Sequence, residues 1–144
     1  MKPFQISTRW SGRLRIVKVR IYDNIKQMRL DAERFGCNYV SDDPGCFSQA
    51  LGVAHKWEGG SFTSNGGFVT DPVVGLIRLY RGEMGSRVIT HEVTHLAVWI
   101  YHIDCTTRIG DPFENIENEE VMCYLVGDLV GKLVDRLYKY GLLL

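Results

Sequence analysis

Two histidines four positions apart, with a glutamate directly after the first, are the residues of this chain best suited to chemistry. They are His91, Glu92 and His95 in the segment VITHEVTHLAV, and they form the pattern H-E-x-x-H. On a helix both imidazoles can bind one metal ion at about 2.0–2.1 Å, and the glutamate beside them can deprotonate a zinc-bound water. The pattern predicts zinc-dependent hydrolysis. The alternative is an ordinary amphipathic helix whose histidines bond to backbone or carboxylate groups.

A metal site of this kind needs a third protein ligand. Tyr101 stands where the pattern H-E-x-x-H-x-x-G-x-x-H has its third histidine. His102 lies about two helical turns beyond His95, so it cannot reach the same ion while the helix stays intact. We therefore expect a carboxylate from the later segment ENEEVMCYLVGDLVGKL, at 117–133.

Two glutamates of that segment are alternatives for the third ligand. Glu119 falls on the predicted apolar face of the helix, which is formed by Val126, Val130, Leu133 and Leu137. Glu120 lies on a flank with two glycines, at 127 and 131. Small residues let another helix approach closely, which favours Glu120, whereas periodicity alone favours Glu119.

The elements that must position these residues are predicted from apolar periodicity and capping signals. Strands are expected at 13–22, 50–57 and 73–80, and helices at 24–35, 87–102 and 118–140. The alternation of the first strand slips at Ile16–Val17, which predicts a bulge. Asp23 or Asn24 can cap the first helix, Gly36 can end it, and segments 36–46 and 59–67 are predicted as turn-rich or flexible connections.

Composition indicates one globular domain spanning 1–144. Lys plus Arg and Asp plus Glu number 17 each, so the formal charge is zero and neither nucleic acid nor membrane is expected as a partner. The basic stretch 2–20 is interpreted as the solvent-exposed face of an edge strand, with a surface that binds phosphate or nucleic acid as the alternative. No signal peptide or membrane span is evident, so we expect a cytoplasmic protein with free thiols at Cys37, Cys46, Cys105 and Cys123.

HEVTHLAV followed by EEVMCYLVG resembles the gluzincin class of zinc metallopeptidases, and more specifically small zincin-like metallopeptidases encoded by bacteriophages. The resemblance covers about residues 75–133. In this family a small residue follows the glutamate ligand by three positions, a spacing that Glu120 and Cys123 match. The resemblance thus implies one zinc ion bound by His91, His95 and Glu120, with Glu119 kept as the alternative ligand.

The resemblance also implies an α+β fold of the minimal zincin-like kind. A small mixed sheet of about three strands would pack with the H-E-x-x-H helix, a long C-terminal ligand helix and one N-terminal helix. The strand before the motif helix would be an edge strand that binds peptide substrate through Gly75 and Arg78. Tyr124 stands where thermolysin-like members have an aspartate that supports the first histidine, and it is a candidate oxyanion donor.

These observations predict a zinc metallopeptidase that hydrolyses peptide bonds, with Glu92 assisting the attack of a zinc-bound water. If phage-encoded, it would act on a peptide or protein in the host cytoplasm. The alternative is a zincin-like module that keeps its zinc, lacks turnover and engages a host or viral protein, because a chain this short leaves little room for a second cleft wall. A zinc hydrolase of another substrate is a further alternative.

Overall fold

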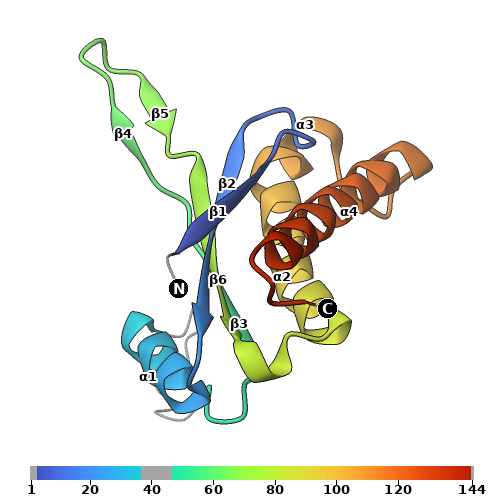
Figure 1. The fold of residues 1–144 in the computed structure, drawn as a ribbon. Coiled ribbons are helices and arrows are strands. Elements are labelled where there is room, and N and C mark those ends of the chain that lie inside the picture. The colour runs from blue at the N-terminus through green and yellow to red at the C-terminus, as the bar shows by residue number, and fades with distance from the viewer. Residues whose placement is uncertain (1–2, 37–46, 144) are drawn as a thin grey trace.

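A four-stranded mixed sheet forms the centre of the computed structural model, which describes residues 3–36 and 47–143 (Figure 1). Its strands, in order across the sheet, are β1 (Phe4–Thr8), β2 (Arg15–Tyr22), β6 (Val73–Tyr80) and β3 (Gly52–Lys56). β2 runs parallel to β6, whereas β1 and β3 are antiparallel to their neighbours. The edges of this sheet are therefore β1 and β3.

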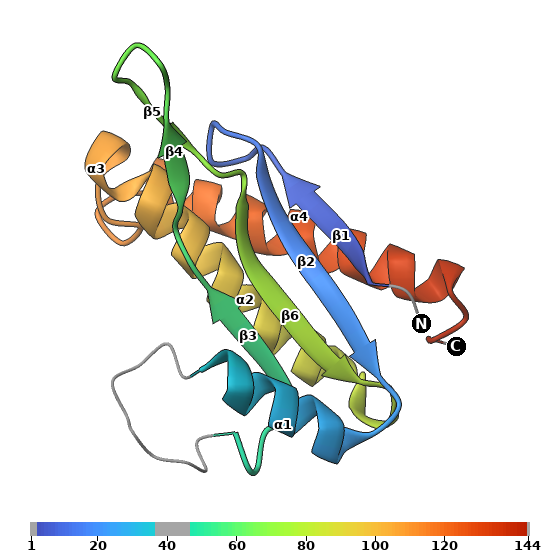
Figure 2. The same ribbon diagram turned by 90° about the vertical axis from the view of Figure 1, so that its left-hand side faces the viewer.

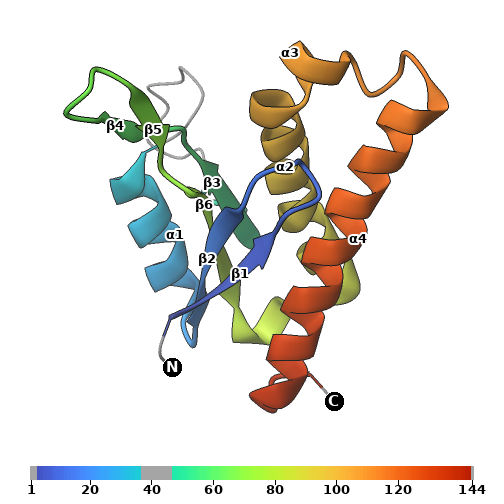
Figure 3. The ribbon, with the colours of Figure 1, turned by 90° about the horizontal axis from the view of Figure 1, so that it is seen from above.

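Helices cover both faces of the sheet. The helical elements are α1 (Ile25–Phe35), the 3₁₀ turn η1 (Arg81–Glu83), α2 (Ser86–Asp104), α3 (Thr106–Ile109) and α4 (Ile116–Lys139). Figure 3 shows α1 on one side of the sheet and α2 and α4 on the other. α2 packs over β3 and β6, and α4 packs against α2 and β1. A separate hairpin of β4 (Gly60–Phe62) and β5 (Phe68–Thr70) extends beyond the sheet (Figure 2).

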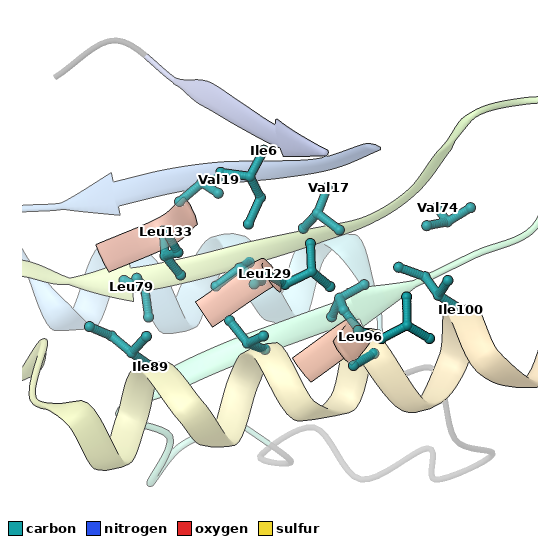
Figure 4. Packing of buried hydrophobic residues seen from close by; sticks show 14 of the residues in the cluster. Ile6, Val17, Val19, Val74, Leu79, Ile89, Leu96, Ile100, Leu129 and Leu133 are labelled. Carbon is teal, nitrogen blue, oxygen red and sulfur yellow. The ribbon is translucent and has the colours of Figure 1, made fainter. Parts of the chain in front are cut away.

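The main core lies between the sheet and the α2–α4 pair (Figure 4). Alternation on β2 directs Val17 and Val19 toward this core, and both are fully buried. Leucines and isoleucines at helical spacing supply the other side. They are Ile89, Leu96 and Ile100 on α2, and Leu125, Leu129, Leu133 and Leu137 on α4.

A buried ion pair ties the end of α2 to the start of β2. Arg15 Nη2 and Nε lie 2.5 and 2.8 Å from the two carboxylate oxygens of Asp104, and both side chains are almost fully buried. The Ser11 hydroxyl donates a further hydrogen bond of 2.6 Å to Asp104, and Arg15 Nη1 donates one of 3.1 Å to the carbonyl of Asp71. The loops at this end of the sheet are thereby joined to α2.

Much of the predicted secondary structure is confirmed, including the α+β class. The pairing of β2 with β6 shifts register between Ile16 and Val17, where the bulge was predicted. Asn24 caps α1 through its side chain, and Gly36 ends that helix with φ of 102°. Apart from Gly36, the turn-rich segment predicted at 36–46 lies outside the described residues.

Five elements were not predicted, namely β1, the two strands β4 and β5 of the hairpin, η1 and α3. The sheet therefore has four strands rather than about three, and β2 is an interior strand, so the expectation of an edge strand there was wrong. Of its basic residues, Arg15 is buried in the ion pair, whereas Lys18 and Arg20 are exposed. In the described part of the chain, no helix combines the length and apolarity that crossing a bilayer requires.

The buried face of α4 agrees with the prediction at Leu133 and Leu137 and differs from it nearer the start of the helix. Leu125 and Leu129 are buried in place of Val126 and Val130, which are half-buried. A Cβ added at either helix glycine, 127 or 131, would meet no atom within 4 Å. The sequence had suggested that another helix approaches closely at this glycine pair, and that prediction was wrong.

Candidate metal and catalytic site

The position of α2 over the sheet depends on Gly75 of β6. A Cβ built on this residue would lie 2.0 Å from Leu96 Cδ1 and 2.8 Å from the carbonyl oxygen of His55. Only glycine therefore allows the helix to pack this closely on the strand. This approach places one side of α2 along β3, at the edge of the sheet (Figure 3).

His91 and His95 lie on the exposed part of α2 with their ring nitrogens directed at one another. Their Nε2 atoms are 3.2 Å apart and the two rings are nearly perpendicular, at 82°. Two ligands about 2.05 Å from a tetrahedral metal ion are about 3.3 Å apart, so the pair has the spacing of two zinc ligands. The His91 side chain is 68% exposed, so the pair is open to solvent.

Glu92 turns away from solvent toward β3. It is 6% exposed, and its Oε1 atom lies 4.0 Å from His91 Nε2. Burial raises its pKa to about 7, although a hydrogen bond from the backbone of Ala54 partly offsets this effect. A Cβ at Gly52 would come within 2.9 Å of the Glu92 side chain, so glycine leaves room for the carboxylate at the strand.

The edge of β3 that pairs with no other strand among the described residues runs beside these three side chains. Trp57 N–H donates to the Val74 carbonyl at 3.0 Å, and alternate residues along an antiparallel strand bond to the partner. Backbone groups of Gly52 and Ala54 therefore point away from β6, and the bond from Ala54 to Glu92 agrees with this direction. The pKa of His95 is lowered by burial and then by the charges of His91 and Lys56, the last residue of β3.

A pocket of about 670 Å³ opens beside His91 and Glu92. Its walls come from the N-terminal turn of α2, from η1 and from the segment that leads into β3. Val88 and Leu51 are among the apolar lining residues, and Arg87 and Glu83 are charged. The buried carboxylate and the exposed imidazole thus share a cavity with space for a side chain or small ligand.

The structure does not bring Glu119 or Glu120 to the histidine pair. Both glutamates are exposed on the first turns of α4, and α4 lies on the side of α2 opposite β3 (Figure 3). Within residues 3–36 and 47–143, no group of three His, Cys, Asp or Glu side chains could hold a metal ion. The described chain therefore brings together two histidines with the spacing of metal ligands and a neighbouring carboxylate, without the third ligand that the sequence predicted.

The prediction that 73–80 forms an edge strand was wrong, because β6 is paired on both sides. Gly75 faces α2, and Arg78 is 3% exposed on the opposite face, where it donates to the Tyr22 hydroxyl. Their assignment to substrate binding rested on the edge position, which belongs to β3. The nearly unbroken apolar run VVGLIRLY is typical of an interior strand, so the sequence did contain a signal for the interior position of β6.

Tyr124 lies apart from the histidine pair. Its ring stacks on Trp10 in the β1–β2 loop, with centroids 4.4 Å apart. Conversely, Gly52 and Ala54 contact Glu92 and were not among the predicted site residues. Comparison with protein-family models, curated proteins and solved structures finds no match to this chain. The resemblance to gluzincins therefore remains a prediction from the motif.

Proposed function

We propose that this chain is a zinc-dependent peptidase whose site is formed by His91, Glu92 and His95. One observation carries the proposal: the Nε2 atoms of the two histidines are 3.2 Å apart, with a buried carboxylate at 4.0 Å from one of them. Two imidazoles at this separation suit a tetrahedral metal ion, and imidazole nitrogen is a preferred zinc ligand. Bound zinc would lower the pKa of a water molecule and polarise a carbonyl.

The chain's own residues divide the remaining tasks. Glu92 is held beside β3 by Ala54, in a position to take a proton from water and return it to the leaving amine. The outward backbone groups of β3 that Glu92 does not occupy can hold an extended peptide across the site by adding a strand to the sheet. Substrate binding is thus assigned to β3 in place of β6. Cytoplasmic location remains part of the proposal.

A second candidate function is a zinc-binding module without turnover. The observation that favours it is that Glu119 and Glu120 lie away from the histidine pair, which leaves the described ligand set incomplete. Such a module would use zinc to join this face of α2 to another protein. A buried Glu92 beside the pair favours the peptidase, because metal binding alone does not need it.

Zinc content and peptide cleavage together test the proposal. Wild type and Glu92→Gln should each bind one zinc ion per chain, measured by elemental analysis after gel filtration. Only wild type should cleave a mixed peptide library that is followed by mass spectrometry. His91→Ala and His95→Ala should lose the zinc and the cleavage.

Matched controls on the same helices keep the test specific. His102→Ala removes another exposed histidine of α2, and Glu120→Gln removes the carboxylate that the motif had suggested; both variants should keep zinc and activity. Zinc with no cleavage by wild type would select the binding module. Absence of zinc from wild type purified in zinc-containing buffer would overturn both candidates.

A further inference from the structure

The β4–β5 hairpin is an exposed arm with two aromatic side chains near its end. Phe62 and Phe68 are cross-strand partners with ring centroids 5.2 Å apart, and they are 80% and 54% exposed. Segment 59–70, GGSFTSNGGFVT, has no charged residue. Figures 1 and 2 show the arm extending away from the sheet and helices. A short ribbon with exposed apolar rings is a surface suited to a partner.

From β3 to β4 the odd-numbered residues keep facing the returning strand, although the Trp57 carbonyl accepts a hydrogen bond from the Trp99 indole N–H of α2. Hydrogen bonds to the returning strand involve Trp57 N–H, the Gly59 carbonyl and Thr63 N–H, which are all odd-numbered positions. The intervening even-numbered residues therefore direct their backbone groups outward. In the two strands this outward row includes Gly52 and Ala54 on β3 and Gly60 and Phe62 on β4.

The irregularity between the two parts of this ribbon falls on the returning strand. One residue separates Trp57 from Gly59, whereas two residues, Pro72 and Val73, separate their partners Asp71 and Val74. The extra residue forms a bulge on the strand that leads into β6. The outer edge of β3 and β4 therefore continues past the bulge without a change of phase, and within the described residues neither strand has a second strand partner.

We propose that the outer edges of β3 and β4 form one continuous docking edge for an extended polypeptide, which reaches from Glu92 to the Phe62–Phe68 pair. The Ala54 N–H is already bonded to Glu92, but the Ala54 carbonyl and the outward N–H and C=O groups of Gly60 and Phe62 match the backbone of an added strand. The uncharged arm lacks the cations that nucleic acid would require. Phe62 lies eight positions beyond Ala54, which corresponds to about 26 Å of extended chain at ~3.3 Å per residue.

This inference rests on the proposed function and specifies its substrate class. A segment bound along the whole edge must be unfolded for about eight residues on one side of the site. The substrate is therefore an unstructured stretch of a protein in preference to a di- or tripeptide. Apolar side chains of that stretch would pack on the two phenylalanines at the far end.

The test compares one long and one short probe. The long probe is reduced, carboxymethylated α-lactalbumin, a permanently unfolded protein, and the short probe is a six-residue quenched-fluorescence peptide that spans a cleavage site mapped in it. For Phe62→Ser/Phe68→Ser, the ratio of kcat/KM for the long probe to that for the short probe should fall at least tenfold, mainly through KM. Phe62→Tyr/Phe68→Tyr should restore most of the ratio. Phe113→Ser, which changes a 90% exposed phenylalanine between α3 and α4, should leave it unchanged.

Binding of the labelled long probe to Glu92→Gln, measured by fluorescence anisotropy, separates this inference from the proposed function. Binding that weakens tenfold with the added Phe62→Ser/Phe68→Ser change supports the docking edge, even if wild type cleaves nothing. Cleavage with an unchanged ratio would overturn the docking edge and leave the peptidase standing. A concentration-dependent dimer that the serine changes dissociate, with no effect on either probe, would assign the arm to a second copy of the chain and overturn the inference.

Discussion

Replacement of Asp104 by asparagine should destabilise the protein by about 3–5 kcal/mol, although Asn has nearly the same volume. Asp104 accepts two hydrogen bonds from Arg15 and one from Ser11, and the Arg15 side chain is 3% exposed. The variant leaves a buried positive charge without its counter-charge and turns one acceptor oxygen into a donor. For a chain of this size the loss corresponds to a fall in Tm of roughly 10–20 °C.

Urea denaturation followed by circular dichroism and tryptophan fluorescence would measure this loss. The double variant Arg15→Met/Asp104→Leu removes both charges, so it should be less destabilised than either single variant and give a coupling energy of at least about 2 kcal/mol. Additive losses in the double variant, or a loss below about 1 kcal/mol for Asp104→Asn with an unchanged m-value, would refute the assigned role of the pair.

The same pair has a defined pH dependence. Burial alone would raise the pKa of Asp104, but hydrogen bonds from Arg15 and Ser11 outweigh it and the pKa is lowered from 3.8. The carboxylate therefore stabilises the native state at pH values above 3.8, and this contribution is lost as pH falls through the lowered pKa. The stability difference between wild type and Asp104→Asn should accordingly shrink only below about pH 3.8.

Three further predictions use the same denaturation assay. His55 is fully buried, and burial lowers its pKa from 6.5 to about 4. About 3 kcal/mol of stability should therefore be lost between pH 6.5 and 4, and His55→Phe should remove this loss. Equal acid sensitivity of wild type and variant would contradict this prediction. Gly75→Ala should lower the stability by about 1–3 kcal/mol, because its Cβ would lie 2.0 Å from Leu96 Cδ1. Gly127→Ala, on the open surface of α4, should raise the stability by about 0.5–1 kcal/mol. An unchanged stability in Gly75→Ala would contradict the packing assigned to this glycine. In EDTA, Glu92→Gln should stabilise the protein by about 3 kcal/mol at pH 8 but little at pH 5. The reason is that the raised pKa of about 7 makes ionisation of Glu92 costly in the native state. An equal change in stability at both pH values would show that this cost is absent.

Local patterns were predicted well because they depend on neighbours in the chain. The spacing of His91 and His95 sets their geometry within one helix, and the slip at Ile16–Val17 is visible in the alternation itself. The predicted buried face of α4 was right at Leu133 and Leu137 but wrong at Val126 and Val130, because an apolar series through Leu125 and one through Val126 have the same helical spacing. Periodicity does not decide between them, whereas contact with α2 and β1 does.

The arrangement of distant elements was beyond the sequence signals. Whether Glu120 reaches the histidines depends on which side of α2 the last helix packs, and the sequence has no local signal for that. The edge position of β3 depends on the pairing of β6 with β2, which are far apart in the chain. β1, with the sequence FQIST, is short and lacks a strong apolar pattern, so it was not predicted.

The parallel pairing of β2 and β6 has a consequence for the order of folding. Its partners are separated by almost 60 positions, as in Tyr22 with Tyr80, whereas β3 and β6 belong to one long ribbon. Loop-closure entropy favours the ribbon as the earlier structure, and β2 joins it across the longer loop. During synthesis β2 therefore emerges with β1 as its only strand partner until β6 has been made. Lys18 and Arg20, exposed on β2, would discourage pairing with other nascent chains during that interval.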